Sequence, residues 1–145
     1  MTDTHRFSVS VAGAVVRDDG KVLAIRRRDN GHWEPPGGLL EPGETALEGL
    51  KREVLEETGY AVVPGPLTGV YQNMERDIFA LVFRCSVAGG GARSGDETMD
   101  IEWLTPEVVA ERMTEAYAIR VLDALAIHAS AAVRSHNGQE LLFRR

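Results

Sequence analysis

Residues 38–60 read GLLEPGETALEGLKREVLEETGY, and they are the most informative segment of the chain. A loop rich in proline and glycine leads into the segment, and acidic residues then recur at spacings of three and four. Because residues three and four apart share one face of an α-helix, Glu53, Glu56 and Glu57 are expected to form an acidic ridge. Arg52 precedes Glu56 by one helical turn and can reach it. Hard cations such as Mg²⁺ relieve the repulsion in such a ridge by binding its oxygens, so the spacing predicts a divalent-metal site for phosphate chemistry.

Each part of this segment has a simpler interpretation when it is taken alone. Glu and Lys on a helix usually form a solvated face, and Pro-Gly pairs usually mark turns. Their combination favours a functional site. The chain presents the following in uninterrupted order: Pro36-Gly37-Gly38, Glu44, Arg52-Glu53, Glu56-Glu57 and Gly59.

This order resembles the Nudix box, G-x(5)-E-x(7)-R-E-U-x-E-E-x-G-U, in which U is a bulky aliphatic residue. The residues that match in register are Gly38, Glu44, Arg52, Glu53, Val54, Glu56, Glu57 and Gly59. The departure is Tyr60, an aromatic residue at the last U position. The resemblance implies an α/β fold, the Nudix-type αβα sandwich with a mixed central β-sheet, formed by residues 1–145 as one domain with the box at 38–60.

Length and composition agree with one small soluble domain. A chain of 145 residues can bury about 70% of its unfolded surface, which is enough for an unassisted core. Hydrophobic residues make up 43% and charged residues 26%, which argues against a disordered or fibrous protein. The net charge of −6 disfavours a nucleic-acid footprint, which needs clustered Lys and Arg. The apolar runs are too short to span a bilayer, no secretory signal is found, and Cys85 is the only cysteine, so a cytoplasmic location is expected.

The helix of the box is expected over residues 45–58, stopping at Gly59. Thr45 fits the N-cap position, and Glu48 three residues later completes a capping box. Glu44 is expected to hold the preceding loop near the positive helix terminus. The apolar stripe predicted to face the core consists of Leu47, Leu50 and Val54.

The other elements are predicted from apolar alternation and turn residues. We expect strands at 7–16 and 21–27 in a hairpin, a loop at 32–38, a short strand at 60–63, a break at 64–66, strands at 67–72 and 78–87 as an antiparallel pair, a flexible loop at 88–95, a strand at 100–104, a short helix from 105, and a helix over 117–132. The pattern at 134–145 does not distinguish a docked segment from a frayed one.

The family resemblance implies roles for the residues of the box. Glu53, Glu56 and Glu57 would be metal ligands, with the Gly37 carbonyl as an additional one, and Arg52 would orient the glutamates. The expected cofactor is Mg²⁺, with Mn²⁺ as a substitute. Metal ions clamp phosphates and lower the pKa of bound water. The implied reaction is hydrolysis of the diphosphate linkage in a nucleoside diphosphate linked to another moiety, such as a nucleoside triphosphate or a nucleotide sugar.

The general base and the phosphate contacts remain open at this point. Glu56 could combine metal ligation with water activation, whereas Glu97 lies outside the box on a loop before an expected strand. The simpler interpretation of Glu97 is a solvated acid beside Asp96. Arg26 and Arg28 either contact a substrate phosphate or form a solvated strand end.

Two function classes follow. The favoured one is a Mg²⁺-dependent hydrolase, and the alternative is a catalytically inactive Nudix module that senses a nucleotide or binds a partner. Intact Glu53, Glu56 and Glu57 favour the enzyme, because an inactive module has no chemical need of all three. The expected partner is a phosphorylated small molecule, with nucleotides first, and a homodimer stays open. Residues 75–78 carry neither the proline nor the tyrosine that marks some ADP-ribose and dinucleoside-polyphosphate subfamilies, so the sequence does not fix the substrate.

Overall fold

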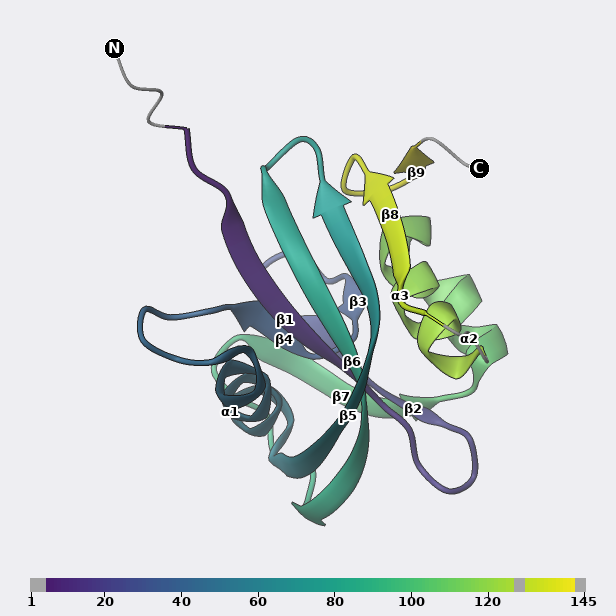
Figure 1. Ribbon diagram of the computed structural model, residues 1–145. Helices are drawn as coiled ribbons and strands as arrows, with labels where there is room; N and C mark the ends of the chain where they lie inside the picture. Colours follow the sequence, from purple (N-terminus) through teal and green to yellow (C-terminus); the bar gives the residue numbers. More distant parts are fainter. Residues whose placement is uncertain (1–4, 127–129, 143–145) are drawn as a thin grey trace.

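A computed structural model describes residues 5–126 and 130–142 (Figure 1). The described part contains three helices: α1 (Ala46–Thr58), α2 (Pro106–Arg112) and α3 (Glu115–Leu125). Its strands are β1 (Ser8–Val15), β2 (Val22–Arg27), β3 (Trp33–Glu34), β4 (Gly37–Leu39), β5 (Tyr60–Asn73), β6 (Ile78–Gly90), β7 (Thr98–Leu104), β8 (Ala132–His136) and β9 (Leu141–Leu142).

The strands form two sheets that lie between α1 on one side and α2 and α3 on the other (Figure 1). The larger sheet has the order β4-β1-β6-β5-β8-β9, and the smaller one has the order β3-β2-β7. The larger sheet is mixed, because the pairs β1–β6 and β5–β8 are parallel and its other pairs are antiparallel. The predicted αβα sandwich with a mixed sheet is therefore confirmed.

Strand β1 is apolar and buried from Val11 to Val15, because both of its faces are covered there. Val11 and Val15 belong to the core cluster beneath α1, whereas Ala12 and Ala14 pack with Ala124 of α3. Side chains alternate between the two faces of a strand, so a strand buried on both faces reads as a continuous apolar run.

Helix α1 has the predicted ends but a different buried stripe. The Thr45 side chain accepts a hydrogen bond from Glu48 N–H in a complete capping box, and Gly59 adopts the left-handed conformation at φ 80°. Leu50 and Val54 are fully buried, but Leu47 is 46% exposed, so its prediction as a core residue is wrong. The buried stripe is rotated away from Leu47 because α1 also turns acidic side chains inward, as described below.

Several predicted elements differ because long-range pairing overrides local signals. Strands β1 and β2 share a single bridge, Val16 with Val22, and then enter different sheets instead of forming a hairpin. The break predicted at 64–66 is wrong, because β5 continues through it with a register shift against β6 that accommodates the two prolines. The antiparallel β5–β6 pair itself is confirmed.

The loop predictions are also corrected in part. Two short strands, β3 and β4, occupy the expected loop 32–38, and β6 extends to Gly90 into the expected loop 88–95. The helix predicted over 117–132 ends at Leu125, and residues 127–129 of that prediction lie outside the described residues. Residues 132–142 contain β8 and β9, so this segment docks on β5.

Within the described ranges, no helix is long and apolar enough to cross a membrane.

Candidate active site

Two acids of α1, Glu53 and Glu57, point inward and lie against the loop that contains β4. Glu57 Oε1 accepts a hydrogen bond from Gly37 N–H at 2.7 Å. A Cβ atom at Gly38 would lie 2.6 Å from the Glu53 carboxyl carbon, and one at Gly37 would overlap the Val11 carbonyl oxygen. Because glycine has no Cβ, the loop can approach the helix this closely. The glycine pair and the two acids therefore form one structural unit.

The environment of these acids favours a cation. Burial raises the pKa of Glu57 to about 8, and the charges of Glu53 and Glu34 act in the same direction. Burial also raises the pKa of Glu53. Neighbouring buried carboxyl groups are costly to ionise, and a divalent cation that binds their oxygens relieves this cost. Carboxylate oxygens beside a glycine backbone are a donor set that fits Mg²⁺ or Mn²⁺.

Glu56 is more exposed than the other two glutamates. Its side chain is 61% exposed, and its Oε2 accepts a hydrogen bond from Arg52 Nη1 at 3.3 Å. Glu53 and Glu57 face the glycine loop. Glu56 remains next to Glu53, because Arg52 Nη1 donates to both side chains, so the three acids neighbour one another as predicted but only two of them face the loop. Among the described residues, no three His, Cys, Asp or Glu side chains lie close enough together to hold a metal ion. Metal ligation by Glu56 stays a prediction.

Arg52 joins the acids of the box. Its Nε and Nη2 donate to the two oxygens of Glu44 at 2.9 and 2.7 Å, and its Nη1 donates to Glu53 at 2.8 Å. The guanidinium holds the pKa of Glu44 at about 2. Glu44 also accepts the N–H of Glu41 at 2.9 Å, which fixes the loop before α1. Arg52 thus makes the contacts expected of a residue that orients Glu53, and Glu44 has the loop-holding position expected of it.

A cavity of about 770 Å³ opens beside this unit and extends across the sheet to α3. Its lining includes Arg27, Glu34, Gly37, Gly38, Glu53, Glu57, Asn73, Arg76, Glu97, Tyr117 and Arg120.

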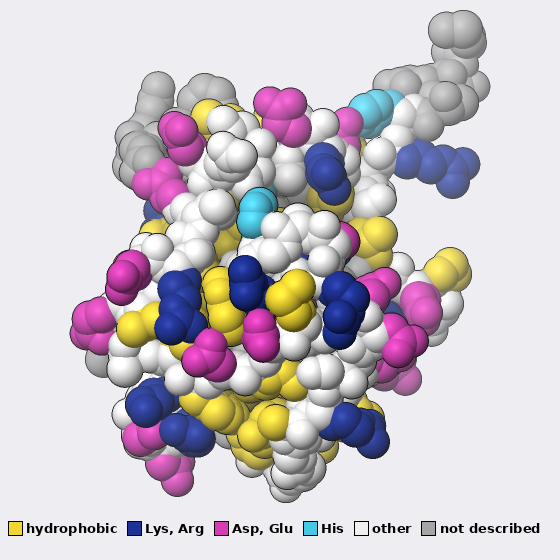
Figure 2. All heavy atoms as spheres, turned by 180° about the vertical axis from the view of Figure 1, so that it is seen from behind, with side chains coloured by type: hydrophobic (Ala, Val, Ile, Leu, Met, Phe, Trp, Pro, Cys, Tyr) yellow, Lys and Arg dark blue, Asp and Glu magenta, His cyan; other side chains and the backbone are white. Residues whose placement is uncertain are grey.

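On the face seen in Figure 2, Lys and Arg side chains are interspersed with Asp, Glu and apolar groups. That face is therefore mixed in charge, unlike the basic surface with which proteins bind nucleic acids.

The structure brings Glu97 to the cavity, where its negative charge contributes to raising the pKa of Glu53. Arg28 holds the loop that carries Glu97. Its backbone N–H donates to the Glu97 carbonyl at 2.9 Å, and its side chain donates to the carbonyls of Asp96 and Thr98 at 3.1 and 3.2 Å. Arg28 therefore supports the loop, while Glu97 lines the cavity.

The basic residue of β2 that lines the cavity is Arg27, whereas Arg26 and Arg28 do not line it. Arg26 donates to the Gly31 carbonyl at 3.1 Å and lies 3.6 Å from Asp100. Strand alternation explains the difference, because Arg26 and Arg27 point to opposite faces of β2. The residue of this basic run that lines the cavity is therefore neither of the two selected from the sequence.

Two further cavity residues, Glu34 and Arg120, were also missed. Glu34 stands in the HWEPPGG segment, where an acid directly before the glycine loop was the available signal. Arg120 is a lone basic residue on the apolar helix EAYAIRVLDAL. A charge on the buried face of a helix was the signal there.

Comparison with known proteins assigns the family. A sequence model described as the NUDIX domain matches residues 6–125. The chain belongs to the Nudix family. A MutT-like protein of Streptomyces ambofaciens is 58% identical to it over 141 residues, which cover 97% of this chain and 91% of that protein. An ADP-ribose pyrophosphatase of Methanocaldococcus jannaschii is 37% identical over 103 residues, which cover 66% of this chain and 60% of that protein. A solved Nudix hydrolase from Nitrosomonas europaea superimposes with a TM-score of 0.79 at 20% identity, over 92% of this chain and 82% of that one, and shows the shared fold alone.

Membership confirms the resemblance drawn from the box. The chain is a MutT-like Nudix pyrophosphohydrolase, a class that generally uses divalent metal ions. The Nudix box is the segment in which α1 and the glycine loop meet, so the family motif and the inward acids coincide.

Proposed function

We propose that this Nudix hydrolase cleaves the diphosphate linkage of a nucleoside diphosphate joined to another group, and that the reaction depends on Mg²⁺. The observation that supports this most is the pair Glu53 and Glu57, held against Gly37 and Gly38 on the wall of a cavity of about 770 Å³. Buried carboxylates beside an open cavity are suited to binding a metal ion together with a phosphorylated ligand.

Glu53, Glu57 and the Gly37 carbonyl would hold Mg²⁺, with Glu56 as the further ligand that the box predicts and Mn²⁺ as a substitute. When bound, the metal ion supplies positive charge to the phosphate oxygens and lowers the pKa of water. Arg52 keeps the Glu53 carboxylate in one orientation through its hydrogen bond of 2.8 Å. The Gly37 N–H fixes Glu57 in the same way.

We assign the general base to Glu97 in preference to Glu56. The charges of both residues act on Glu53, but Glu97 lines the cavity, whereas Glu56 does not line it and its side chain is 61% exposed. In the proposed step the oxygen of water attacks a phosphorus atom, its proton passes to the Glu97 carboxylate, and the bond from phosphorus to the leaving oxygen breaks. Arg27 takes the phosphate-binding role expected of Arg26 and Arg28, because it is the basic residue of that run on the cavity wall.

The test is a panel of nucleoside triphosphates, nucleotide sugars, ADP-ribose, NADH and dinucleoside polyphosphates, assayed with Mg²⁺ and with Mn²⁺ for release of phosphate-containing products. On a substrate found in this way, Glu57→Gln should lower turnover by at least about a hundredfold. Glu111→Gln, an exposed substitution of the same kind on α2, is the matched control and should retain activity. Unchanged turnover of Glu57→Gln would contradict the assigned site. No hydrolysis across the panel would favour a nucleotide-sensing module instead.

A further inference from the structure

Arg120 of α3 is a buried arginine with no carboxylate partner among the residues that the structure describes. It is 7% exposed, and it is one of the residues that line the cavity. Its one hydrogen-bond contact to a described residue joins Nη2 to His136 Nε2 at 3.3 Å, and its Nε has no partner. A buried and unpaired guanidinium is costly, which calls for an acceptor from outside the protein.

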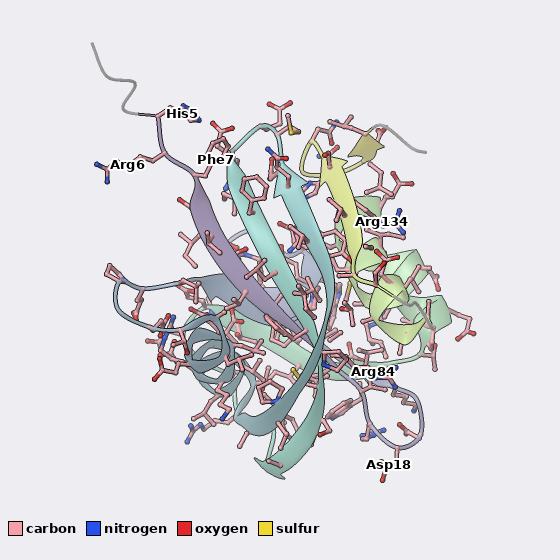
Figure 3. The ribbon with its side chains drawn as sticks, in the orientation of Figure 1. His5, Arg6, Phe7, Asp18, Arg84 and Arg134 are labelled. Carbon is pink, nitrogen blue, oxygen red and sulfur yellow. The ribbon has the colours of Figure 1, made fainter. Side chains whose placement is uncertain are left out.

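The acid nearest to Arg120 on the same helix is already engaged. Both oxygens of Asp123 accept hydrogen bonds from Arg134 at 2.7 Å, and one also accepts the Tyr71 hydroxyl at 2.7 Å. Figure 3 shows Arg134 on β8 beside α3. The rings of Tyr117 and Tyr71 lie 4.6 and 5.4 Å from the Arg120 guanidinium carbon and partly offset its buried charge. The rings fix the position of the guanidinium and accept none of its in-plane hydrogen bonds.

The contact between Arg120 and His136 has an excess of donors. His136 Nδ1 accepts a hydrogen bond from Gly138 N–H at 2.9 Å, so a neutral ring carries its proton on Nε2, the atom that faces Arg120. Burial, and then the charge of Arg120, lower the pKa of His136 to about 4, which keeps the ring neutral at physiological pH. Two N–H groups therefore face each other without an acceptor between them.

The surrounding wall continues this pattern. Asn73 Oδ1 already accepts the N–H groups of Glu75 and Arg76 at 3.0 and 3.2 Å, which leaves the donor amide nitrogen of Asn73 for the cavity. Tyr117 adds a partly buried aromatic ring. Glu34 is the acceptor close by, since its charge interacts with that of Arg120 and with that of Glu57. This end of the cavity combines an aromatic surface, several donors and one carboxyl group.

We propose that Arg120 is a specificity-determining residue that binds an oxo group of the substrate's nucleobase, with the base lying against Tyr117. The assignment rests on the proposed function, which places the diphosphate beside Glu53 and Glu57 at the other end of the same cavity. An oxo oxygen offers two lone pairs to the guanidinium, whereas an exocyclic amino group would present further donors to it. The ring N–H beside an oxo group can donate to Glu34. Cytosine keeps an oxo group at C2, but no ring N–H lies beside it. The site therefore takes hypoxanthine, guanine or uracil in preference to adenine or cytosine.

The experiment compares two pairs of nucleotides that differ at one exocyclic position, ITP with ATP and UTP with CTP. We expect kcat/KM to be at least about tenfold higher for the oxo member of each pair. Arg120→Met should remove this preference by raising KM for the oxo members while leaving kcat and the amino members nearly unchanged. Arg17→Met is the control for loss of an arginine: Arg17 is exposed, pairs with Asp19 and does not line this cavity, so the variant should retain the preference.

A binding measurement separates this inference from the proposed function. Calorimetry on the metal-free protein should show tighter binding of IMP than of AMP, and Arg120→Met should abolish the difference. Selective binding without hydrolysis of any nucleotide would sustain the role of Arg120 and reject the proposed function. Hydrolysis with equal kcat/KM for both members of each pair would overturn the role of Arg120 and leave the proposed function standing. An equal loss of kcat/KM for all four nucleotides in Arg120→Met would have the same meaning, because it would indicate that Arg120 contacts a phosphate group. If Arg120→Met does not fold, Arg120→Lys takes its place in both measurements and should likewise weaken the preference for the oxo nucleotides. The preference of the wild-type protein is measurable without any variant, and its absence would overturn the role of Arg120.

Discussion

Replacing Glu57 by glutamine should stabilise the metal-free protein while it abolishes hydrolysis. Burial raises the pKa of this carboxyl from its ordinary 4.5 to about 8. Below pH 4.5 the folded and unfolded chains both hold the proton. As the pH rises from 4.5 towards 8, the unfolded chain releases the proton and the folded chain keeps it, so the contribution of Glu57 to stability is progressively lost.

The magnitude follows from the gap between the two pKa values. Each pH unit in that interval costs about 1.4 kcal/mol of unfolding free energy, so at pH 7 the loss reaches up to about 3 kcal/mol, and at pH 5 it stays below about 1 kcal/mol. Glutamine carries no charge and can still accept the Gly37 N–H through its side-chain oxygen. For a chain of this length, a gain of about 3 kcal/mol corresponds to a rise in Tm of roughly 6–12 °C.

The assay is urea and thermal unfolding in EDTA at pH 5 and pH 7, repeated with Mg²⁺. Glu57→Gln should gain stability over the wild type mainly at pH 7, and Mg²⁺ should stabilise the wild type much more than the variant. Glu111→Gln should match the wild type in both respects. A variant that is no more stable than the wild type at pH 7, or that gains equally at both pH values, would refute the reasoning from the buried charge.

Three further predictions concern the glycine loop, the proposed general base and a buried hydrogen bond. Gly38→Ala should push the Glu53 carboxyl from its place, because the added Cβ would lie 2.6 Å from its carbon; we expect a higher Mg²⁺ requirement for half-maximal activity, and an unchanged titration would contradict this. Glu97→Gln should lower kcat and remove the acidic limb of the pH-rate profile, whereas an unaltered profile would remove Glu97 as the base. Tyr71→Phe should leave Asp123 with one partner fewer and cost about 1–2 kcal/mol in urea unfolding, with no effect on Mg²⁺ dependence; a loss below 0.5 kcal/mol would show that the bond contributes little.

The local features of the box were predictable because they depend on residues close in sequence. The N-cap at Thr45, the capping box to Glu48 and the stop at Gly59 follow from backbone hydrogen bonds within a few residues. The contacts of Arg52 with Glu53 and Glu56 follow from neighbouring positions on one helix. Which acids turn inward was not predictable, because it is set by the strand and the loop that pack against α1.

The elements outside the box show the same division. The helix expected over 117–132 rested on the apolar periodicity of Ile119, Leu122 and Leu125, but residues 132–136 pair with β5 and form β8. The break expected at 64–66 rested on prolines, which β5 accommodates because its register against β6 shifts there. In both places, pairing with a strand distant in sequence outweighs local propensity.

Arg120 shows why a residue of the candidate site could escape a reading of the sequence. Its spacing places it four residues from Ala116 and from Ala124, both buried on α3, so a charge at this position needs a partner. The sequence offers one at once, since Asp123 follows three residues later on the same helix face. In the folded protein, Asp123 instead accepts hydrogen bonds from Tyr71, which lies 52 residues away, and from Arg134, which lies 11 residues away. Because residues of β5 and β8 donate hydrogen bonds to both oxygens of Asp123, the Arg120 guanidinium remains available to a ligand. These contacts depend on the packing of β5 and β8 against α3, which the sequence of α3 alone does not show.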